Sequence, residues 1–225
     1  MGAGWIASYL SSSVGKKNIM ALTGAGLVIF LLGHMAGHLI MFGGRDAYNT
    51  YAEAMQANPL LWPARLGLLA VFFVHMALAF ALTAQNRAAR PVAYAKKNFQ
   101  EASVASRTMI NTGIVIFFFL LYHLAHFTLF WVQDTGPYLD DQGRHDVYTR
   151  MVDAFHNPIV FITYALALVA LTGHLIHGIR SMFQSLGLNH ERYNWLIKVG
   201  SLKVAGIIIV GFLAVPVAIV IGVIS

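Results

Sequence analysis

Residues 108–133 read TMINTGIVIFFFLLYHLAHFTLFWVQ, and this stretch decides the fold class because no Asp, Glu, Lys or Arg interrupts it. A helix needs about 20 predominantly apolar residues to cross the hydrocarbon core of a bilayer. The sequence therefore predicts an all-α integral membrane protein. The charge-free stretches of this kind are 18–44, 66–86, 108–133, 154–179 and 204–225. The transmembrane helices are expected at about 19–42, 63–85, 108–132, 158–183 and 202–224.

The composition agrees with a membrane protein and excludes several other classes. The 225-residue chain is 58% hydrophobic and 11% charged, whereas about a quarter of the residues in a soluble domain are charged. It contains no cysteine, which excludes disulfides and a cysteine-ligated iron–sulfur cluster on this chain. The glycine-rich nucleotide-binding motifs G-x-G-x-x-G and G-x-x-x-x-G-K-[ST] are both absent from the sequence. Residues 1–17 are expected to form a short interfacial segment, because Trp5 and Tyr9 suit the headgroup region.

The basic residues indicate how the chain crosses the membrane. If the N-terminus is cytoplasmic, eleven of the 15 basic residues lie inside and four outside. Seven of the nine acidic residues then lie outside. An excess of Lys and Arg in cytoplasmic loops is the usual determinant of orientation. The net charge of +6 is therefore interpreted as a topology signal rather than as a nucleic-acid footprint, and the C-terminus is expected on the outer side.

Histidines are unusually frequent in the predicted helices. The chain has ten, and seven lie in the first four predicted helices: His34, His38, His75, His123, His126, His174 and His177. Ionisable residues inside a bilayer are costly and usually functional. A lone buried histidine is often an ordinary core residue hydrogen-bonded to a neighbour, but at least one in each of four helices favours a shared role.

The depth of these histidines groups them into two layers. With a rise of about 1.5 Å per residue, His34 and His123 lie about 12–14 Å from the outer ends of their helices. His38 and His126 both lie about 7.5 Å from those ends and could form this outer pair instead. His75 and His174 lie about 20–24 Å deep by the same measure. Two histidines at one depth can bind a haem iron from both sides, and neutral imidazole is an ordinary haem ligand. Zinc is the alternative metal, although no acid or cysteine lies nearby to complete a tetrahedral site.

Several segments together resemble a known family. They are SVGKKNIMALTGAGLVIFLLGHMAGHL, FFVHMALAFALTAQNRAARP, ASRTMINTGIVIFFFLLYHLAHF and GHLIHGIRSMFQSLGLNHERY. In this order they resemble the di-haem cytochrome b membrane subunit of succinate:quinone oxidoreductases and fumarate reductases (complex II), in its five-helix single-subunit form. The resemblance implies that residues 1–225 form one transmembrane cytochrome b domain in the bacterial cytoplasmic membrane.

The resemblance also implies ligands, cofactors and partners. The inner of two stacked b haems would be held by His75 and His174, and the outer one by His34 and His123. His38, His126 and His177 would lie beside the haems or a quinone without binding iron. The chain would form an electron-transfer complex with a flavoprotein and an iron–sulfur subunit, active as an enzyme only in that complex. The resemblance leaves open a higher oligomer of the complex and the choice of menaquinone or ubiquinone.

Two further site predictions concern charged residues. Arg107 and Arg180 stand at the inner ends of the third and fourth predicted helices, where a cation would contact the propionates of the inner haem. Glu53, in the loop after the first predicted helix, is a candidate proton carrier for quinone chemistry and a surface acid by the simpler interpretation.

Two other functions remain open from the sequence. The chain could be the cytochrome b subunit of a membrane hydrogenase or formate dehydrogenase, which differs in its partner rather than in its haems. It could also be a transporter with a histidine proton relay, although transporters more often carry acids within their helices, and the predicted helices here contain none.

Overall fold

A computed structural model of the chain describes residues 3–89, 103–133 and 139–225. Within that part of the chain the protein is all-α, and five helices are long and apolar enough to cross a membrane. The all-α, five-helix prediction is confirmed. These helices are α2 (Ser13–Leu39), α4 (Leu61–Ala88), α6 (Met109–Phe127), α8 (Pro158–Ser185) and α9 (Asn194–Val220). The inner-side residues Arg90, Lys96, Lys97 and Glu101 lie outside the described part.

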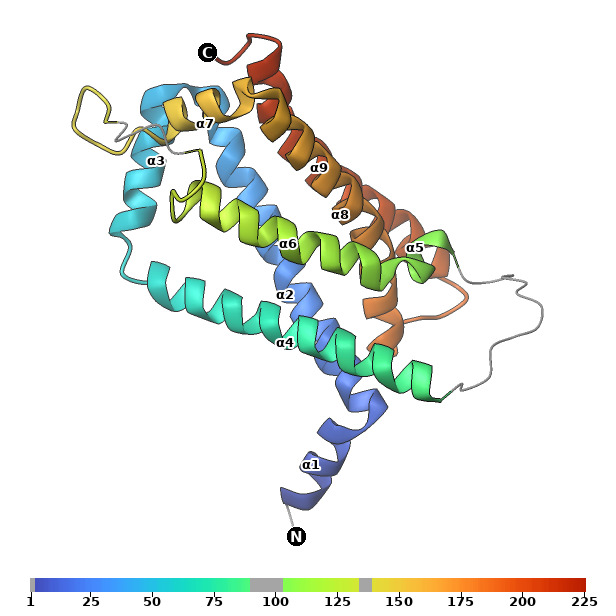
Figure 1. Cartoon of the computed structure of the whole chain (residues 1–225). Helices are drawn as coiled ribbons and strands as arrows, with labels where there is room; N and C mark the ends of the chain where they lie inside the picture. Colours follow the sequence, from blue (N-terminus) through green and yellow to red (C-terminus); the bar gives the residue numbers. More distant parts are fainter. Residues whose placement is uncertain (1–2, 90–102, 134–138) are drawn as a thin grey trace.

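Short helices lie at the two ends of the bundle (Figure 1). Helices α3 and α7 lie near the C-terminus at one end, called here the cap end, while the N-terminus lies at the opposite end, called the N-terminal end. This separation of the termini follows from an odd number of long helices. The bounds of the shorter helices are α1 (Ala3–Ser11), η1 (Ile40–Gly43), α3 (Arg45–Ala57), α5 (Val104–Arg107) and α7 (Val147–His156).

An Asn-Pro pair joins each short cap helix to the long helix that follows it. The side-chain oxygen of Asn157 accepts a hydrogen bond from the backbone N–H of Ile159 at 3.0 Å, and Pro158 begins α8. Asn58 likewise accepts from the N–H of Leu60 at 2.9 Å, just before α4. Proline suits a first helical turn, because the N–H that it lacks would have no partner within the helix.

Helix α6 ends at Phe127, earlier than the predicted residue 132. Beyond it the backbone folds back, so that the N–H groups of Leu129 and Trp131 donate to the carbonyls of Leu124 and Ala125 at 2.8 Å. Phe130 has a positive φ of 56°, a conformation that no helix can contain. Apolar composition continues through this turn, which is why composition alone placed the helix end too late.

Helix α9 begins at Asn194 rather than near residue 202. Its first turns carry Lys198, which lies before the start of the predicted helix. Long lysine side chains can extend from a helix end to the membrane surface, so charged residues in the first turns are compatible with a membrane helix.

Helix α9 is the most enclosed of the long helices. Ala205, Ile208 and Ile219 are fully buried, and Ile208 and Ala205 pack with residues of α8. A Cβ atom added to Gly211 would overlap the Sδ atom of Met35. Helices α2 and α9 therefore meet at a glycine, as small residues allow in membrane bundles.

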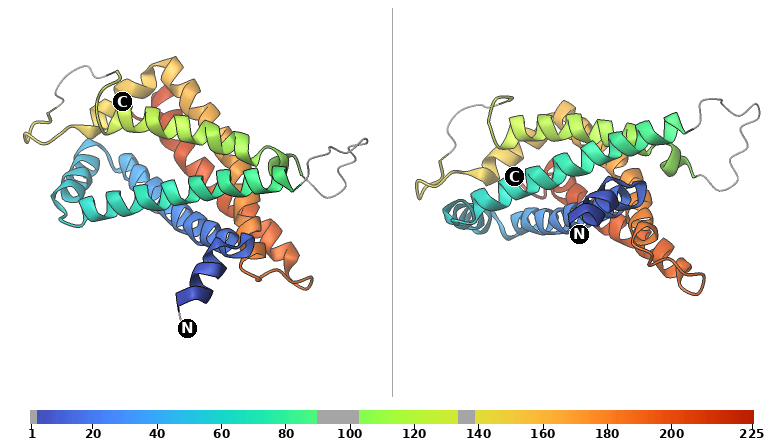
Figure 2. Two further views of the ribbon diagram at one scale, coloured as in Figure 1. Left: turned by 60° about the horizontal axis from the view of Figure 1, so that its bottom comes forward. Right: turned by 90° about the horizontal axis from the view of Figure 1, so that it is seen from below.

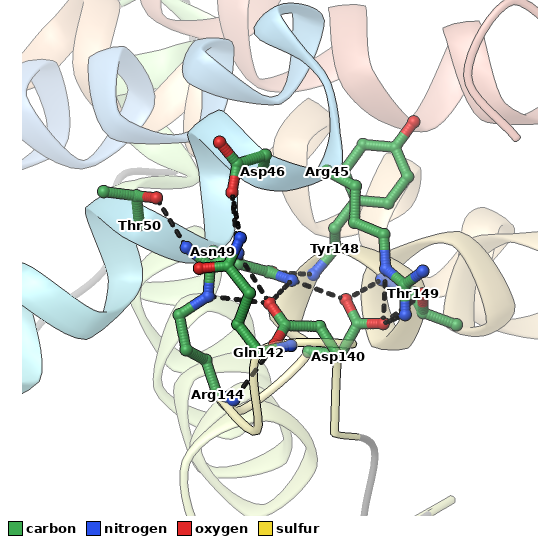
Figure 3. Close-up of polar contacts among 10 residues, drawn as sticks. Arg45, Asp46, Asn49, Thr50, Asp140, Gln142, Arg144, Tyr148 and Thr149 are labelled. Atoms are coloured by element: carbon green, nitrogen blue, oxygen red, sulfur yellow. Dashed lines mark hydrogen bonds and ion pairs between the residues drawn. The ribbon is translucent and has the colours of Figure 1, made fainter.

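Polar residues join α3 to α7 at the cap end (Figure 3). Asn49 is fully buried, and its amide donates to Asp146 at 2.9 Å and Asp140 at 3.1 Å. Its oxygen accepts from the backbone N–H of Tyr148 at 3.1 Å. Arg45 forms an ion pair of 2.6 Å with Asp146. Since the buried groups of this network are hydrogen-bonded, their desolvation cost is offset, and the network can fix the two helices relative to each other.

The cap should lose stability at acid pH. Burial by itself would raise the pKa of Asp146, but hydrogen bonds from Arg45, Thr149 and Asn49 outweigh it and hold this pKa well below its usual range. The charged carboxylate therefore stabilises the cap above pH about 4, the pKa of an unfolded Asp, and this stabilisation is lost as the pH falls further. We expect Asp146→Asn to cost about 1–2 kcal/mol at pH 7 and to weaken this acid dependence.

Thermal unfolding of the detergent-solubilised protein at pH 7 and pH 3, followed by circular dichroism, measures both effects. Asp46→Asn is the matched control, because Asp46 also pairs with an arginine but its side chain is 76% exposed. An Asp146→Asn variant as stable as the wild type at pH 7 would show that the network does not stabilise the cap.

Candidate cofactor site

A cavity of about 1770 Å³ lies among α2, α4, α6 and α8. Figure 2 shows these helices from two further directions, with α4 and α6 on one side of α2 and α8. The cavity exceeds the roughly 300–1,000 Å³ of an ordinary small-molecule site. Its lining is mostly apolar, and it contains the four histidines predicted as ligands: His34, His75, His123 and His174. The space therefore suits one large or two medium-sized apolar ligands.

His75 and His174 meet across this cavity, with their ring centroids 6.5 Å apart. Nδ1 of His75 lies 3.2 Å from the carbonyl oxygen of Met20. A carbonyl oxygen only accepts, so Nδ1 carries the proton and Nε2 keeps its lone pair. The same tautomer follows for His174, whose Nδ1 lies 3.2 Å from Oγ1 of Thr112, because that hydroxyl donates to the carbonyl of Met109 at 3.0 Å. Hydrogen bonds of this kind orient a metal-binding imidazole.

A repeated sequence motif holds both rings. Residues 20–24 read MALTG and residues 109–113 read MINTG. Thr23 Oγ1 lies 3.1 Å from Nδ1 of His75, as Thr112 does from His174. A Cβ atom on Gly24 would lie 3.3 Å from Cε1 of His75, and one on Gly113 3.5 Å from Cε1 of His174. The threonines were not predicted as supports of the rings, although the M-x-x-T-G repeat is visible in the sequence.

His34 and His123 form a second pair nearer the cap end, with ring centroids 5.9 Å apart. Nδ1 of His123 lies 3.3 Å from the hydroxyl of Tyr164, which leaves Nε2 for another partner. Nε2 of His34 instead lies 3.3 Å from Nε2 of His38, and Nδ1 of His38 lies 2.9 Å from the hydroxyl of Tyr48. Of these two histidines, His123 is therefore the one that is oriented through Nδ1 with its Nε2 left for a metal.

The separations of the two pairs can be compared with what a shared metal requires. Two nitrogens that bind one metal from opposite sides at about 2 Å lie about 4 Å apart. A ring nitrogen lies about 1.1 Å from its ring centre, given C–N bonds near 1.33 Å, so the two centres would be about 6.2 Å apart. The observed 6.5 Å and 5.9 Å both lie close to this value. The donor set therefore fits two metals, each held by two histidines.

The other three membrane histidines differ in position. His38 and His177 line the central cavity beside the pairs. His126 is 3% exposed, and its Nδ1 lies 3.2 Å from the hydroxyl of Tyr164. It lines a separate cavity of about 230 Å³, not the central one. Although His123 and His126 are three residues apart, they therefore contact different spaces.

The charged residues predicted for this site lie elsewhere. Arg107 and Arg180 are exposed and are not among the described residues that line the central cavity. Glu53 is exposed on α3 and also lies outside the lining, although its neighbours Tyr51 and Ala52 contribute to it. None of these three side chains therefore lines the cavity, and their contacts with propionates or with a proton path stay predictions.

The donor set does not suit zinc. Within the described residues, no three His, Cys, Asp or Glu side chains come close enough to hold a metal ion. A structural zinc site takes four protein ligands and a catalytic one three. Two histidines suffice for haem iron, since the porphyrin supplies the other four donors.

Comparison with known proteins identifies one family. The family model described as "Succinate dehydrogenase/Fumarate reductase transmembrane subunit" matches residues 83–218, more than half of the 225 residues. The match includes His123 and His174 but begins after His34 and His75. Comparison with curated proteins gives no match, and neither does comparison with solved structures.

Proposed function

This chain belongs to the succinate dehydrogenase/fumarate reductase transmembrane subunits, and on this premise we propose that it carries electrons between an iron–sulfur subunit and a membrane quinone through two b haems. The observation that carries the proposal is the pairing of four histidines in two layers, at 6.5 Å and 5.9 Å, within one apolar cavity.

Four histidines of the chain hold the haems in this proposal. His75 and His174 would bind the inner haem, and the contacts of Thr23 and Thr112 with Nδ1 of these two histidines would leave their ring Nε2 atoms available as ligands. His34 and His123 bind the outer haem, and Tyr164 orients His123. When bound, the haems would supply one-electron redox chemistry. The apolar lining of the cavity excludes water from the site.

The proposed partners follow from the family and from what the chain lacks. A flavoprotein subunit oxidises succinate or reduces fumarate, and an iron–sulfur subunit carries single electrons to or from this chain. We place the N-terminus in the cytoplasm of a bacterium, because eleven of the 15 basic residues then lie inside. That basic surface would face the partner subunits at the N-terminal end of the bundle.

Reduction of a quinone also requires protons. Glu53 is exposed on α3 and does not line the cavity, which favours its role as a surface acid. The quinone is menaquinone or ubiquinone in this proposal. A redox titration of the haems would bound which of them the protein can serve.

The test is to purify the complex with an affinity tag on this chain and to count its cofactors. We expect two b haems per chain with low-spin spectra of bis-histidine ligation, and co-purification of a succinate-oxidising flavoprotein. A preparation that is folded and complete but free of haem would refute the proposal. Co-purification of a nickel or molybdenum protein would instead support the hydrogenase or formate dehydrogenase alternative, against which the family match speaks.

A further inference from the structure

We propose that Lys17 binds the propionate carboxylates of the inner haem. The proposal rests on the proposed function, since it concerns the same cavity and the same cofactor. It replaces the contact predicted for Arg107 and Arg180, neither of which lines the cavity.

The position of Lys17 on α2 places it beside the inner pair. Lys17 precedes Met20 by one helical turn, and the Met20 carbonyl accepts the hydrogen bond from His75. One turn of three residues advances about 4.5 Å along the helix. Lys17 lines the central cavity on the N-terminal side of the His75 ring. A haem bound by His75 and His174 would lie within reach of this long side chain.

Polar side chains from two other helices line the same end of the cavity. Asn86 follows His75 by three turns of α4, and Ser181 follows His174 by two turns of α8. Residues seven or eleven positions apart share a helix face, because 3.6 residues complete a turn. The two side chains therefore project on the same sides as the ligands, nearer the membrane surface. A cation that lines the same end of a cavity as an amide and a hydroxyl can form a site for a carboxylate.

Helix geometry explains why Arg180 does not join them. It follows His174 by six residues, which rotates its side chain by about 120° away from the face of His174. Among the described residues that line the cavity, the Lys and Arg side chains are Lys17, Arg65 and Arg150. Arg65 follows the start of α4 and Arg150 lies in α7, so both belong to the cap end. Lys17 is thus the cation that this lining offers at the N-terminal end.

The chain supplies a matched control for the test. Lys16 carries the same charge one residue away but does not line the cavity. We therefore compare Lys17→Gln, Lys17→Arg and Lys16→Gln in the purified complex. The readouts are haem content and the midpoint potential of each haem from a redox titration. The inner haem is identified by its absence from a His174→Ala variant.

We expect Lys17→Gln to lower the midpoint potential of the inner haem or to reduce its occupancy, because loss of a nearby positive charge favours the more positive ferric state. The outer haem should keep its potential. Lys17→Arg and Lys16→Gln should resemble the wild type.

Two results would overturn the proposal. One is a Lys17→Gln variant with the same inner-haem potential and occupancy as Lys16→Gln. The other is a Lys17→Arg variant as impaired as Lys17→Gln, because the requirement would then not be for charge. Both leave two haems in the wild type and the proposed function intact, whereas a haem-free wild-type complex would refute the proposed function itself.

Discussion

The His174→Ala variant should contain one b haem per chain instead of two, because the inner haem loses one of its two iron ligands. His75→Ala should give the same result, since the two rings face each other at 6.5 Å. The outer haem, held one layer away, should be largely retained. Electron transfer from succinate to quinone should stop in both variants, whereas succinate oxidation by a soluble artificial acceptor should continue at the flavoprotein. Haem content, optical spectra and these two assays measure the effects.

A graded variant separates ligation from folding. Thr112→Val removes the hydroxyl that accepts from Nδ1 of His174 but leaves the ring in place. Loss of such a supporting contact typically lowers metal affinity about 10–100-fold, so this variant should bind the inner haem more weakly rather than lose it. Retention of both haems at wild-type levels in His174→Ala would exclude His174 as a ligand.

Substitution of His123 should remove the outer haem, whereas substitution of His126 should not. His123 lines the central cavity and faces His34 at 5.9 Å, while His126 lines the smaller cavity near Gln133 and Asp153. Both rings reach the hydroxyl of Tyr164, so a merely structural role would affect the two variants alike. Haem content and the potentials of the remaining haems in His123→Ala and His126→Ala distinguish these cases.

The His126→Ala variant serves as the control, because it removes a buried imidazole from the same helix. We expect it to keep both haems, with a shift in the outer-haem potential at most. Loss of the outer haem in His126→Ala with retention in His123→Ala would reverse the assignment and make His126 the ligand.

Local sequence determined the number and the chemistry of the long helices. Bilayer thickness alone sets the need for about 20 apolar residues per crossing. Uninterrupted stretches such as 108–133 were therefore sufficient to predict the number of membrane-spanning helices. The fixed rise per residue likewise ordered the histidines by depth. It grouped His75 with His174, and it allowed His34 to pair with His123 while leaving His38 with His126 as an alternative. The rings of His75 and His174, and those of His34 and His123, contact each other. Periodicity and length are properties of one segment, which is why the sequence could specify them.

Tertiary structure decided what depends on packing between segments. The end of α6 at Phe127 follows from a backbone turn that apolar composition does not encode. The assignment of His123 rather than His126 to the central cavity depends on how α6 is rotated against α8. The cap network joins Asn49 to Asp146 across 97 positions of sequence. The rotation of a helix about its axis and the contacts between distant residues are set only when the helices pack. The length of an apolar stretch determines neither of them.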